Sequence, residues 1–200
     1  MIHPDTEVRF INNIVGYGVV AKKFIPKGTI TWVQDELDVV YTAEKTAGIS
    51  PLMQEYLETY CFLNGRGEKI LCWDIAKYVN HSFKSNCVST AYDFEIAVRD
   101  IYPGEQLTDD YGYLNVAEPF EAEDEGTERK VVYPDDILKY HTVWDNAVAE
   151  NLSNIKQVAQ PLLKFVPEAV WNEFSSVLEG HTALKSIQSC YFEQRVANRA

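Results

Sequence analysis

The fold of this chain is decided by two stretches about two dozen residues apart, NHSFKSNC at residues 80–87 and GEQLTDDYGY at residues 104–113. The first stretch places an amide, an imidazole and a hydroxyl side by side, and a second amide follows at Asn86. The second begins in a turn and carries Tyr111 followed at once by a glycine. These side chains suit a site that binds a polar cofactor and orients a neutral nucleophile, and they do not suit hydrolysis driven by a strong base.

Length and composition indicate a single globular domain, or a domain with a substantial appendage. The chain has 200 residues, of which 46% are hydrophobic and 24% charged, as in ordinary soluble proteins. No stretch approaches the ~18 apolar residues that a membrane-spanning helix needs. The N-terminus lacks the basic and apolar regions of a signal peptide. We therefore expect an intracellular, cytoplasmic protein without membrane attachment.

The balance of charge bears on partners. The formal net charge is −12, which disfavours direct binding of nucleic acid and favours basic partners, including lysine-rich tails. Alternatively, the acidity serves only solubility. The four cysteines and four histidines are dispersed and show no metal-ligand spacing, so we expect free thiols and no metal site.

The first half of the chain reads mainly as short strands separated by turns. Runs of β-branched and aromatic residues predict strands at 8–11, 19–21, 29–34, 38–42, 69–73, 88–92 and 94–98, with a hairpin turn at Asp93. A helix is expected after Ser50, because proline follows at the first helical position and apolar residues continue at helical spacing. This β-rich region spans residues 1–116.

The second half changes character. Residues 117–132 are rich in acidic side chains and are expected to form a linker or surface loop. Residues 133–200 are expected to be helical, with one helix beginning near Asp135 and ending by Pro161, a second over 167–178, and a third over 182–195. Their apolar stripes need cover, which predicts packing on the β-rich region or on a second copy in a homodimer.

Together with a third segment, the two opening stretches resemble the SET-domain protein-lysine N-methyltransferases. The third segment is GYGVVA at residues 16–21, followed by the turn and strand PKGTI at 26–30. The three elements occur in the family's order, and the resemblance covers roughly residues 8–114. It implies an α+β fold, a β-clip of short twisted sheets in which the two stretches are threaded as a pseudoknot, followed here by the C-terminal helical segment.

The resemblance also implies a reaction, the transfer of a methyl group from S-adenosyl-L-methionine to the ε-amine of a lysine. The substrate would be a basic protein or a lysine-containing peptide. A free lysine has a pKa near 10.4, so neutralising the amine at pH 7 costs about 4.6 kcal/mol. An apolar channel and the positive charge of the cofactor would lower that pKa.

Residue roles carry over from the family by position. Tyr111 would be the catalytic residue whose hydroxyl orients the amine. The expected cofactor-binding residues are Gly16, Tyr17, Gly18, Asn80, His81 and Tyr111. Asn86 would brace the threaded segment. Tyr60 and Phe62 either line a lysine channel or belong to the core.

The chain departs from the family at three places. Phe83-Lys84-Ser85 replaces the Cys-x-Pro that often follows Asn-His-Ser. Asp109 stands where the family often has an aromatic residue, so it either borders the lysine channel and bears on the number of methyl groups added, or faces solvent. No cysteine-rich zinc segment follows residue 114, so zinc is not expected. We hypothesise that the C-terminal helical segment closes the channel instead, with Tyr133, Tyr140 and Trp144 as candidate cover residues.

Two alternatives stay open from the sequence. The chain could be a catalytically silent SET-fold interaction module that acts through its acidic surface, or a methyltransferase for a non-protein amine. The presence of Asn80, His81, Tyr111 and both glycines argues against loss of activity.

Overall fold

The computed structural model describes residues 1–193. Short strands form five small sheets with the orders β1-β2, β3-β9-β8, β4-β6-β5, β7-β10 and β11-β12. The strands are β1 (Thr6–Asn12), β2 (Gly16–Ala21), β3 (Ile30–Val33), β4 (Val39–Tyr41), β5 (Cys61–Leu63), β6 (Lys69–Leu71), β7 (Asn80–His81), β8 (Cys87–Ser89), β9 (Phe94–Ala97), β10 (Thr108–Asp109), β11 (Phe120–Glu121) and β12 (Val131–Val132). The helices are α1 (Ala43–Ala47), α2 (Pro51–Tyr60), α3 (Asp136–Ile155) and α4 (Glu168–Leu178), with 3₁₀ turns η1 (Ile75–Tyr78), η2 (Tyr111–Tyr113), η3 (Leu163–Phe165) and η4 (Ile187–Cys190).

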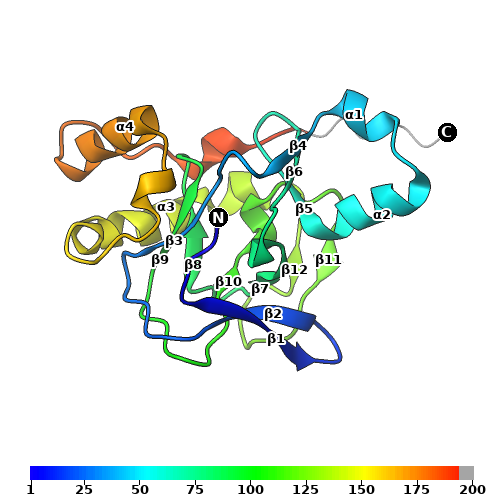
Figure 1. Cartoon of the computed structure of the whole chain (residues 1–200), viewed down its shortest axis with the longest axis horizontal. Coiled ribbons are helices and arrows are strands. Elements are labelled where there is room, and N and C mark those ends of the chain that lie inside the picture. Colours follow the sequence, from blue (N-terminus) through cyan, green and yellow to red (C-terminus); the bar gives the residue numbers. More distant parts are fainter. Residues whose placement is uncertain (194–200) are drawn as a thin grey trace.

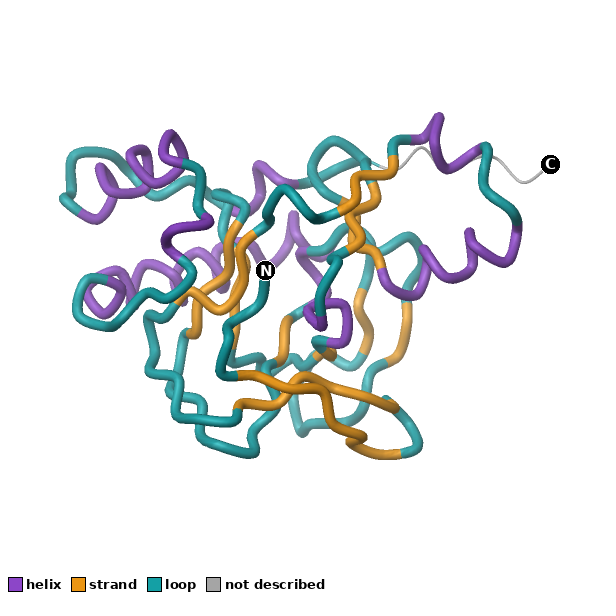
Figure 2. Tube along the Cα trace, viewed as in Figure 1, coloured by secondary structure: helices purple, strands orange, loops and turns teal. Residues whose placement is uncertain are grey.

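The strands occupy the middle of the molecule and the helices lie at its two ends. Figure 2 shows the sheets gathered between α1 and α2 on one side and α3 and α4 on the other. All pairings except β7 with β10 are antiparallel. The predicted mixture of small sheets and a C-terminal helical segment is confirmed.

Local sequence explains the hairpins. Between β1 and β2, the Asn12 side chain accepts hydrogen bonds from the backbone of Ile14 and Val15 at 2.8 and 2.9 Å. Gly16 follows with a φ of 73°, a conformation that glycine adopts without steric cost. Asp93 has a φ of 57° between β8 and β9, as expected for the predicted hairpin turn.

The helices α3 and α4 pack on the sheet β3-β9-β8 (Figure 1). Phe174 of α4 is fully buried, and its ring centroid lies 5.0 Å from that of Tyr92 and 4.9 Å from that of Phe94. Ile137, Trp144 and other apolar residues of α3 belong to the same core. The C-terminal helices therefore belong to the body of the domain, and their apolar stripes are covered within one chain.

The predicted third helix is wrong over residues 182–193, and residues 194–195 lie outside the described part of the chain. Only η4 forms there. Its backbone groups bond to distant side chains: the amide of Ile187 donates to Asp145 at 2.8 Å, and the carbonyl of Cys190 accepts from Asn115 at 2.9 Å. The amide of Lys185 donates to the Tyr92 hydroxyl at 3.1 Å. These tertiary bonds replace the helical ladder, which the local pattern cannot reveal.

The acidic segment over residues 117–132 is also more ordered than the predicted linker. Strands β11 and β12 pair, with Phe120 opposite Val132, and the amide of Ala122 donates to the carbonyl of Lys130 at 3.0 Å. Val132 is fully buried. We refer to residues 120–132 as the acidic hairpin.

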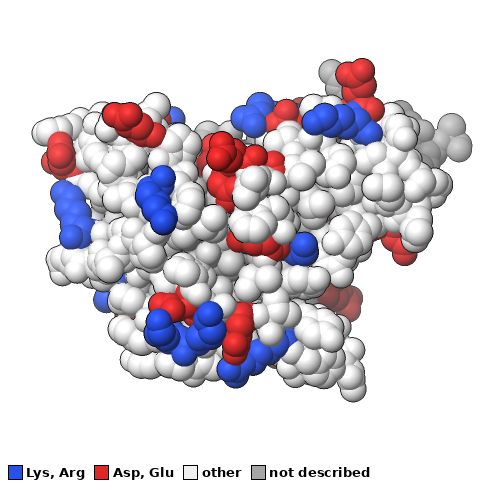
Figure 3. All heavy atoms as spheres, in the orientation of Figure 1, with Lys and Arg blue, Asp and Glu red and all other residues white. Residues whose placement is uncertain are grey.

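Charge is unevenly distributed over the visible surface. In Figure 3, acidic and basic side chains are intermixed at the lower edge, whereas a group of acidic side chains lies together near the upper middle. Among residues 1–193, no helix is long and apolar enough to span a membrane.

The packing of α4 predicts a loss of stability when Phe174 is shortened. Phe174→Ala should lower the free energy of unfolding by about 3–5 kcal/mol, because it leaves a cavity between α4 and β9. Urea unfolding followed by circular dichroism measures this change. The matched control is Val143→Ala on α3, where the side chain is 60% exposed and the change should be small. Equal effects of the two substitutions would contradict this packing.

Candidate functional site

The site is built where the two opening stretches cross. Strands β7 and β10 run parallel, with Asn80 opposite Thr108 and His81 opposite Asp109. The amide of Ser82 donates to the carbonyl of Asp109 at 2.8 Å and extends the pairing. Parallel strands need a connection that crosses over, so the intervening residues must loop back through β8 and β9. The crossing brings the motif residues together.

Asn86 holds this crossing together. Its side-chain nitrogen donates to the Gln106 carbonyl at 2.7 Å, and its side-chain oxygen accepts from the Thr108 amide at 2.9 Å. The residue is almost completely buried, so both bonds lie away from water. The prediction that Asn86 braces the threaded segment is confirmed.

Asn80 connects the crossing to the β1–β2 hairpin. Its side-chain nitrogen donates to the carbonyl of Tyr17 at 3.1 Å and to Oε1 of Gln106 at 3.0 Å. A Cβ atom on Gly18 would lie 2.4 Å from that Gln106 oxygen and 2.8 Å from the Asn80 nitrogen. A side chain at position 18 would therefore displace the side chains of Gln106 and Asn80 from this arrangement. At Gly16 a Cβ atom would meet nothing within 4 Å, so the neighbouring backbone borders open space.

Tyr111 lies at the end of β10, in η2. Its hydroxyl donates to the carbonyl of Val79 at 2.5 Å, and its amide donates to Nδ1 of His81 at 3.1 Å. Burial raises the pKa of Tyr111 well above its usual value. The side chain is thus a neutral phenol that can orient a partner by hydrogen bonding.

His81 is neutral and sits among aromatic rings. Burial lowers its pKa, and its Nδ1 accepts the Tyr111 amide, so the ring proton is on Nε2. The ring centroid lies 4.4 Å from that of Phe83 and 5.6 Å from that of Phe120. Within residues 1–193, Nε2 is buried without a hydrogen-bond partner. An unpaired buried donor fits a site that receives a polar ligand or a water molecule.

The acidic hairpin contributes to this site, which the sequence did not predict. The Phe120 ring centroid lies 6.2 Å from that of Tyr111. The Glu125 carboxylate accepts from the Ser82 hydroxyl at 2.7 Å and from the Phe83 amide at 2.8 Å. An isolated aromatic residue in an acidic run is the only signal that pointed to Phe120.

The three proposed cover residues have other contacts in the structure, and their role as cover stays a prediction. Trp144 is buried against Tyr113, with ring centroids 5.1 Å apart, and its indole nitrogen donates to Asp110 at 3.2 Å. Tyr140 packs beside Trp144, and Tyr133 is exposed. Phe120, in the acidic hairpin, does lie beside Tyr111.

The remaining predicted site residues fall into two groups. Tyr17 is exposed, and its ring meets Tyr78 at a centroid distance of 6.5 Å, while Tyr60 meets the same Tyr78 at 5.6 Å. Tyr60 thus lies in an aromatic row that leads from the β1–β2 hairpin to α2. Phe62 instead packs on Trp32 at 5.7 Å. The assignment of Tyr60 and Phe62 to a lysine channel stays a prediction.

Asp109 is buried, so the alternative that it faces solvent is wrong. Its Oδ1 accepts from the Tyr113 hydroxyl at 2.8 Å, and Glu95 lies beside it. Glu95 in turn accepts from the Thr31 hydroxyl at 2.5 Å. Burial, reinforced by Glu95, raises the pKa of Asp109 well above its usual range. Burial therefore favours the protonated form of Asp109, whose Oδ1 is held by the Tyr113 hydroxyl within the crossing.

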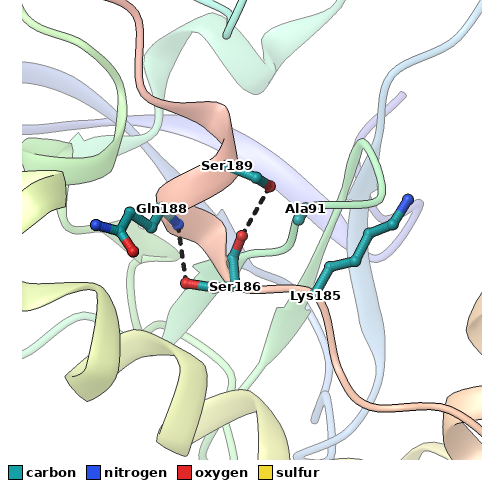
Figure 4. Close-up of a pocket in the computed structure, with 5 residues that line it drawn as sticks. All are labelled: Ala91, Lys185, Ser186, Gln188 and Ser189. Atoms are coloured by element: carbon teal, nitrogen blue, oxygen red, sulfur yellow. Dashed lines mark hydrogen bonds between the residues drawn. The ribbon is translucent and has the colours of Figure 1, made fainter.

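Neither a second depression nor a metal-binding group among residues 1–193 competes with this site. A shallow depression of about 590 Å³ lies at η4 and is lined by Ala91, Lys185, Ser186, Gln188 and Ser189 (Figure 4). Its serines bond within the turn, and Lys185 pairs with Glu173 at 2.6 Å. Over residues 1–193, no group of three or more His, Cys, Asp or Glu side chains is placed to hold a metal ion.

A family model for the SET domain matches residues 16–112, which contain the crossing, the glycine hairpin and Tyr111. The chain therefore contains a SET domain over residues 16–112. This match confirms the predicted SET-type fold and supports methyltransferase activity in general. A crystal structure from Plasmodium falciparum named "putative histone methyltransferase" is similar, with 18% identity and a TM-score of 0.40, covering 55% of this chain and 95% of that chain. No curated protein matches the chain.

The raised pKa of Asp109 predicts a pH dependence of stability. The folded state holds this proton more tightly than the unfolded state does. The protonated Asp109 carboxyl group therefore contributes fully to the free energy of unfolding below about pH 3.9, and this contribution is lost as pH rises through the pKa of the folded state. Asp109→Asn keeps a neutral hydrogen-bonding side chain. Relative to wild type, the variant should therefore gain stability with rising pH, by at most about 1.4 kcal/mol per pH unit.

Urea unfolding over a range of about pH 5 to pH 9 tests this prediction. The control is Asp124→Asn, an exposed carboxylate whose pKa is lowered by Lys130 and which titrates only in acid. Parallel stability curves for wild type and Asp109→Asn across this range would show that Asp109 is ionised in the folded protein.

Proposed function

We propose that this protein transfers a methyl group from S-adenosyl-L-methionine to the ε-amine of a lysine in a protein substrate. The observation that carries the proposal is the neutral Tyr111 hydroxyl, held on the Val79 carbonyl at the crossing that also holds Asn80 and His81. The match to the SET domain supports methyl transfer in general. The identity of the acceptor as a lysine and of the methyl donor as S-adenosyl-L-methionine are both parts of this proposal.

The residues present fit the cofactor. Three features support this fit: open space beside Gly16, the close approach at Gly18, and Nε2 of His81, which is buried without a hydrogen-bond partner within residues 1–193. Asn80, His81 and the backbone of residues 16–18 would hold the cofactor. When bound, it supplies a methyl group on a positively charged sulfur.

The chain itself would orient and desolvate the amine. The Tyr111 hydroxyl stays neutral because its pKa is raised. It can therefore orient the lone pair of an amine by hydrogen bonding without taking a proton from that amine. The Phe120 ring beside Tyr111 is an apolar surface that favours the neutral form of a lysine. Holding the reacting atoms in line accounts for much of the rate of such a displacement.

The net charge of −12 supports a basic protein or lysine-containing peptide as substrate. We expect binding to weaken as salt is raised, since exposed charges attract each other less across a shorter screening length. Homodimerisation through α3 and α4 is a weaker proposal, because their buried faces are already used within the chain.

Incubation of the purified protein with methyl-labelled cofactor and a cell extract tests the function. Wild type should label protein, and Tyr111→Phe should label it at least about 100-fold more slowly, because the amine loses its orienting hydroxyl. The control is Tyr102→Phe, an exposed tyrosine of a surface turn, which should match wild type.

The other outcomes decide between the alternatives. Label confined to small molecules would identify a methyltransferase for a non-protein amine. Cofactor binding without any transfer would identify a silent interaction module. Equal labelling by wild type and Tyr111→Phe would contradict the role given to Tyr111.

A further inference from the structure

Arg129 of the acidic hairpin lies directly behind the turn that carries Tyr111. Its Nη1 pairs with Oδ2 of Asp110, and its Nη2 lies 3.3 Å from Oδ1 of the same carboxylate. Asp110 immediately precedes Tyr111 and accepts the Gly112 amide at 3.0 Å. A two-point contact of this kind fixes both the position and the orientation of the carboxylate.

The same guanidinium reaches a second element. Its Nη2 donates to Oδ2 of Asp136, at the start of α3, at 2.7 Å. The side chains of Asp110 and Asp136 are 4% and 1% exposed, and that of Arg129 is 17% exposed. Although burial opposes its charge, the Asp110 carboxylate raises the pKa of Arg129, which is therefore always charged. One cation thus holds two buried anions.

The Arg129 guanidinium also lies against two aromatic rings. Its central carbon lies 4.6 Å from the centroid of Phe83 and 4.4 Å from the centroid of Tyr140. Phe83 directly follows the Asn-His-Ser segment, so Arg129 contacts both stretches that form the crossing. Stacking on aromatic faces is available to the planar guanidinium and much less to the ammonium of lysine.

The glycine after Tyr111 gives independent support. A Cβ atom on Gly112 would lie 2.7 Å from Nη2 of Arg129 and 3.1 Å from the indole ring of Trp144. The absence of a side chain at Gly112 is what lets Arg129 approach the turn. The turn and the Arg129 side chain therefore have complementary shapes.

We infer that Arg129 is a positioning residue for Tyr111: through Asp110 it fixes the turn that aims the Tyr111 hydroxyl at the transfer site. The inference rests on the proposed function, because the transfer site is part of that proposal. It gives the acidic hairpin the task of securing this site. Glu125 secures the other stretch by binding Ser82 and Phe83.

The test compares Arg129→Lys with Asp136→Asn. Arg129→Lys keeps the charge but loses the two-point contact and the stacking, so the turn should loosen. Asp136→Asn weakens the link to α3 and leaves the pair between Arg129 and Asp110 in place. A merely structural role predicts similar effects for the two variants, whereas a positioning role predicts that only Arg129→Lys affects Tyr111.

The activity measurement uses the protein acceptor labelled by wild type. Arg129→Lys should lower kcat by about tenfold or more while the KM for the cofactor stays near the wild-type value. Asp136→Asn should keep a kcat close to that of wild type. The matched control is Arg66→Lys, an exposed arginine in the turn before β6, which should behave as wild type.

A second measurement needs no substrate. In hydrogen exchange, the amides of Tyr111 and Gly112 should exchange about tenfold faster or more in Arg129→Lys, with the amides of the β1–β2 hairpin unchanged. If Arg129→Lys does not fold, Asp110→Asn removes the same ion pair at constant shape and should give the same local result.

These measurements separate the two proposals. Failure of wild type to transfer any methyl group would refute the proposed function, while the exchange measurement would still decide whether Arg129 holds the Tyr111 turn. Unchanged exchange at Tyr111 and Gly112 in a folded Arg129→Lys would overturn the inference. So would an equal increase throughout the protein, or an equal loss of kcat in Asp136→Asn.

Discussion

The parallel pairing of β7 with β10 is the constraint on which the rest of the structure depends. Two strands of two residues each make few backbone hydrogen bonds and cannot be stable alone. Asn86 compensates, because one buried side chain satisfies a carbonyl and an amide on the opposite segment. The crossing then places Asn80, His81 and Tyr111 within one small region, from segments about 30 residues apart in the chain.

Asp109 and Asp110, adjacent in the second stretch, secure the crossing by opposite electrostatic means. Asp109 lies against Glu95 and Tyr113, and burial raises its pKa and so favours the neutral form. Asp110 lies against Arg129 and Trp144 and is held by an ion pair. A buried carboxyl group must be either neutral or paired, and this strand end uses both solutions on its two sides. Tyr111 directly follows Asp110 in the chain, so the contacts of both aspartates help to fix its position.

Much of the fold could be predicted from sequence because its signals are local. Turn residues such as Asp93, β-branched runs and the helix start at Pro51 all act within a few positions. The SET-type motifs predicted the crossing as well, and the parallel pairing of β7 with β10 confirms it. The strand pairs β7–β10 and β11–β12 were too short to be distinguished from loops by any periodicity.

The contributions of the acidic hairpin could not be predicted, because they depend on contacts between distant residues. Glu125 binds Ser82, which lies 43 positions earlier, and nothing in an acidic run indicates which carboxylate is used in this way. Arg129 stands out as a cation among acids, yet its partners Asp110 and Asp136 become apparent only once α3 is placed. The missing third helix has the same origin, because distant side chains took over its backbone bonds.

The central claim is that the crossing forms a cofactor site whose shape depends on how Asn80 and Gln106 pack beside Gly18. Calorimetric titration of S-adenosyl-L-methionine into wild type and Gly18→Ala tests it most directly. The account predicts one binding event per chain for wild type and a loss of at least about tenfold in affinity for a folded Gly18→Ala, because the new methyl group displaces Asn80 and Gln106. Absence of binding by wild type, or equal affinity in the variant, would contradict it.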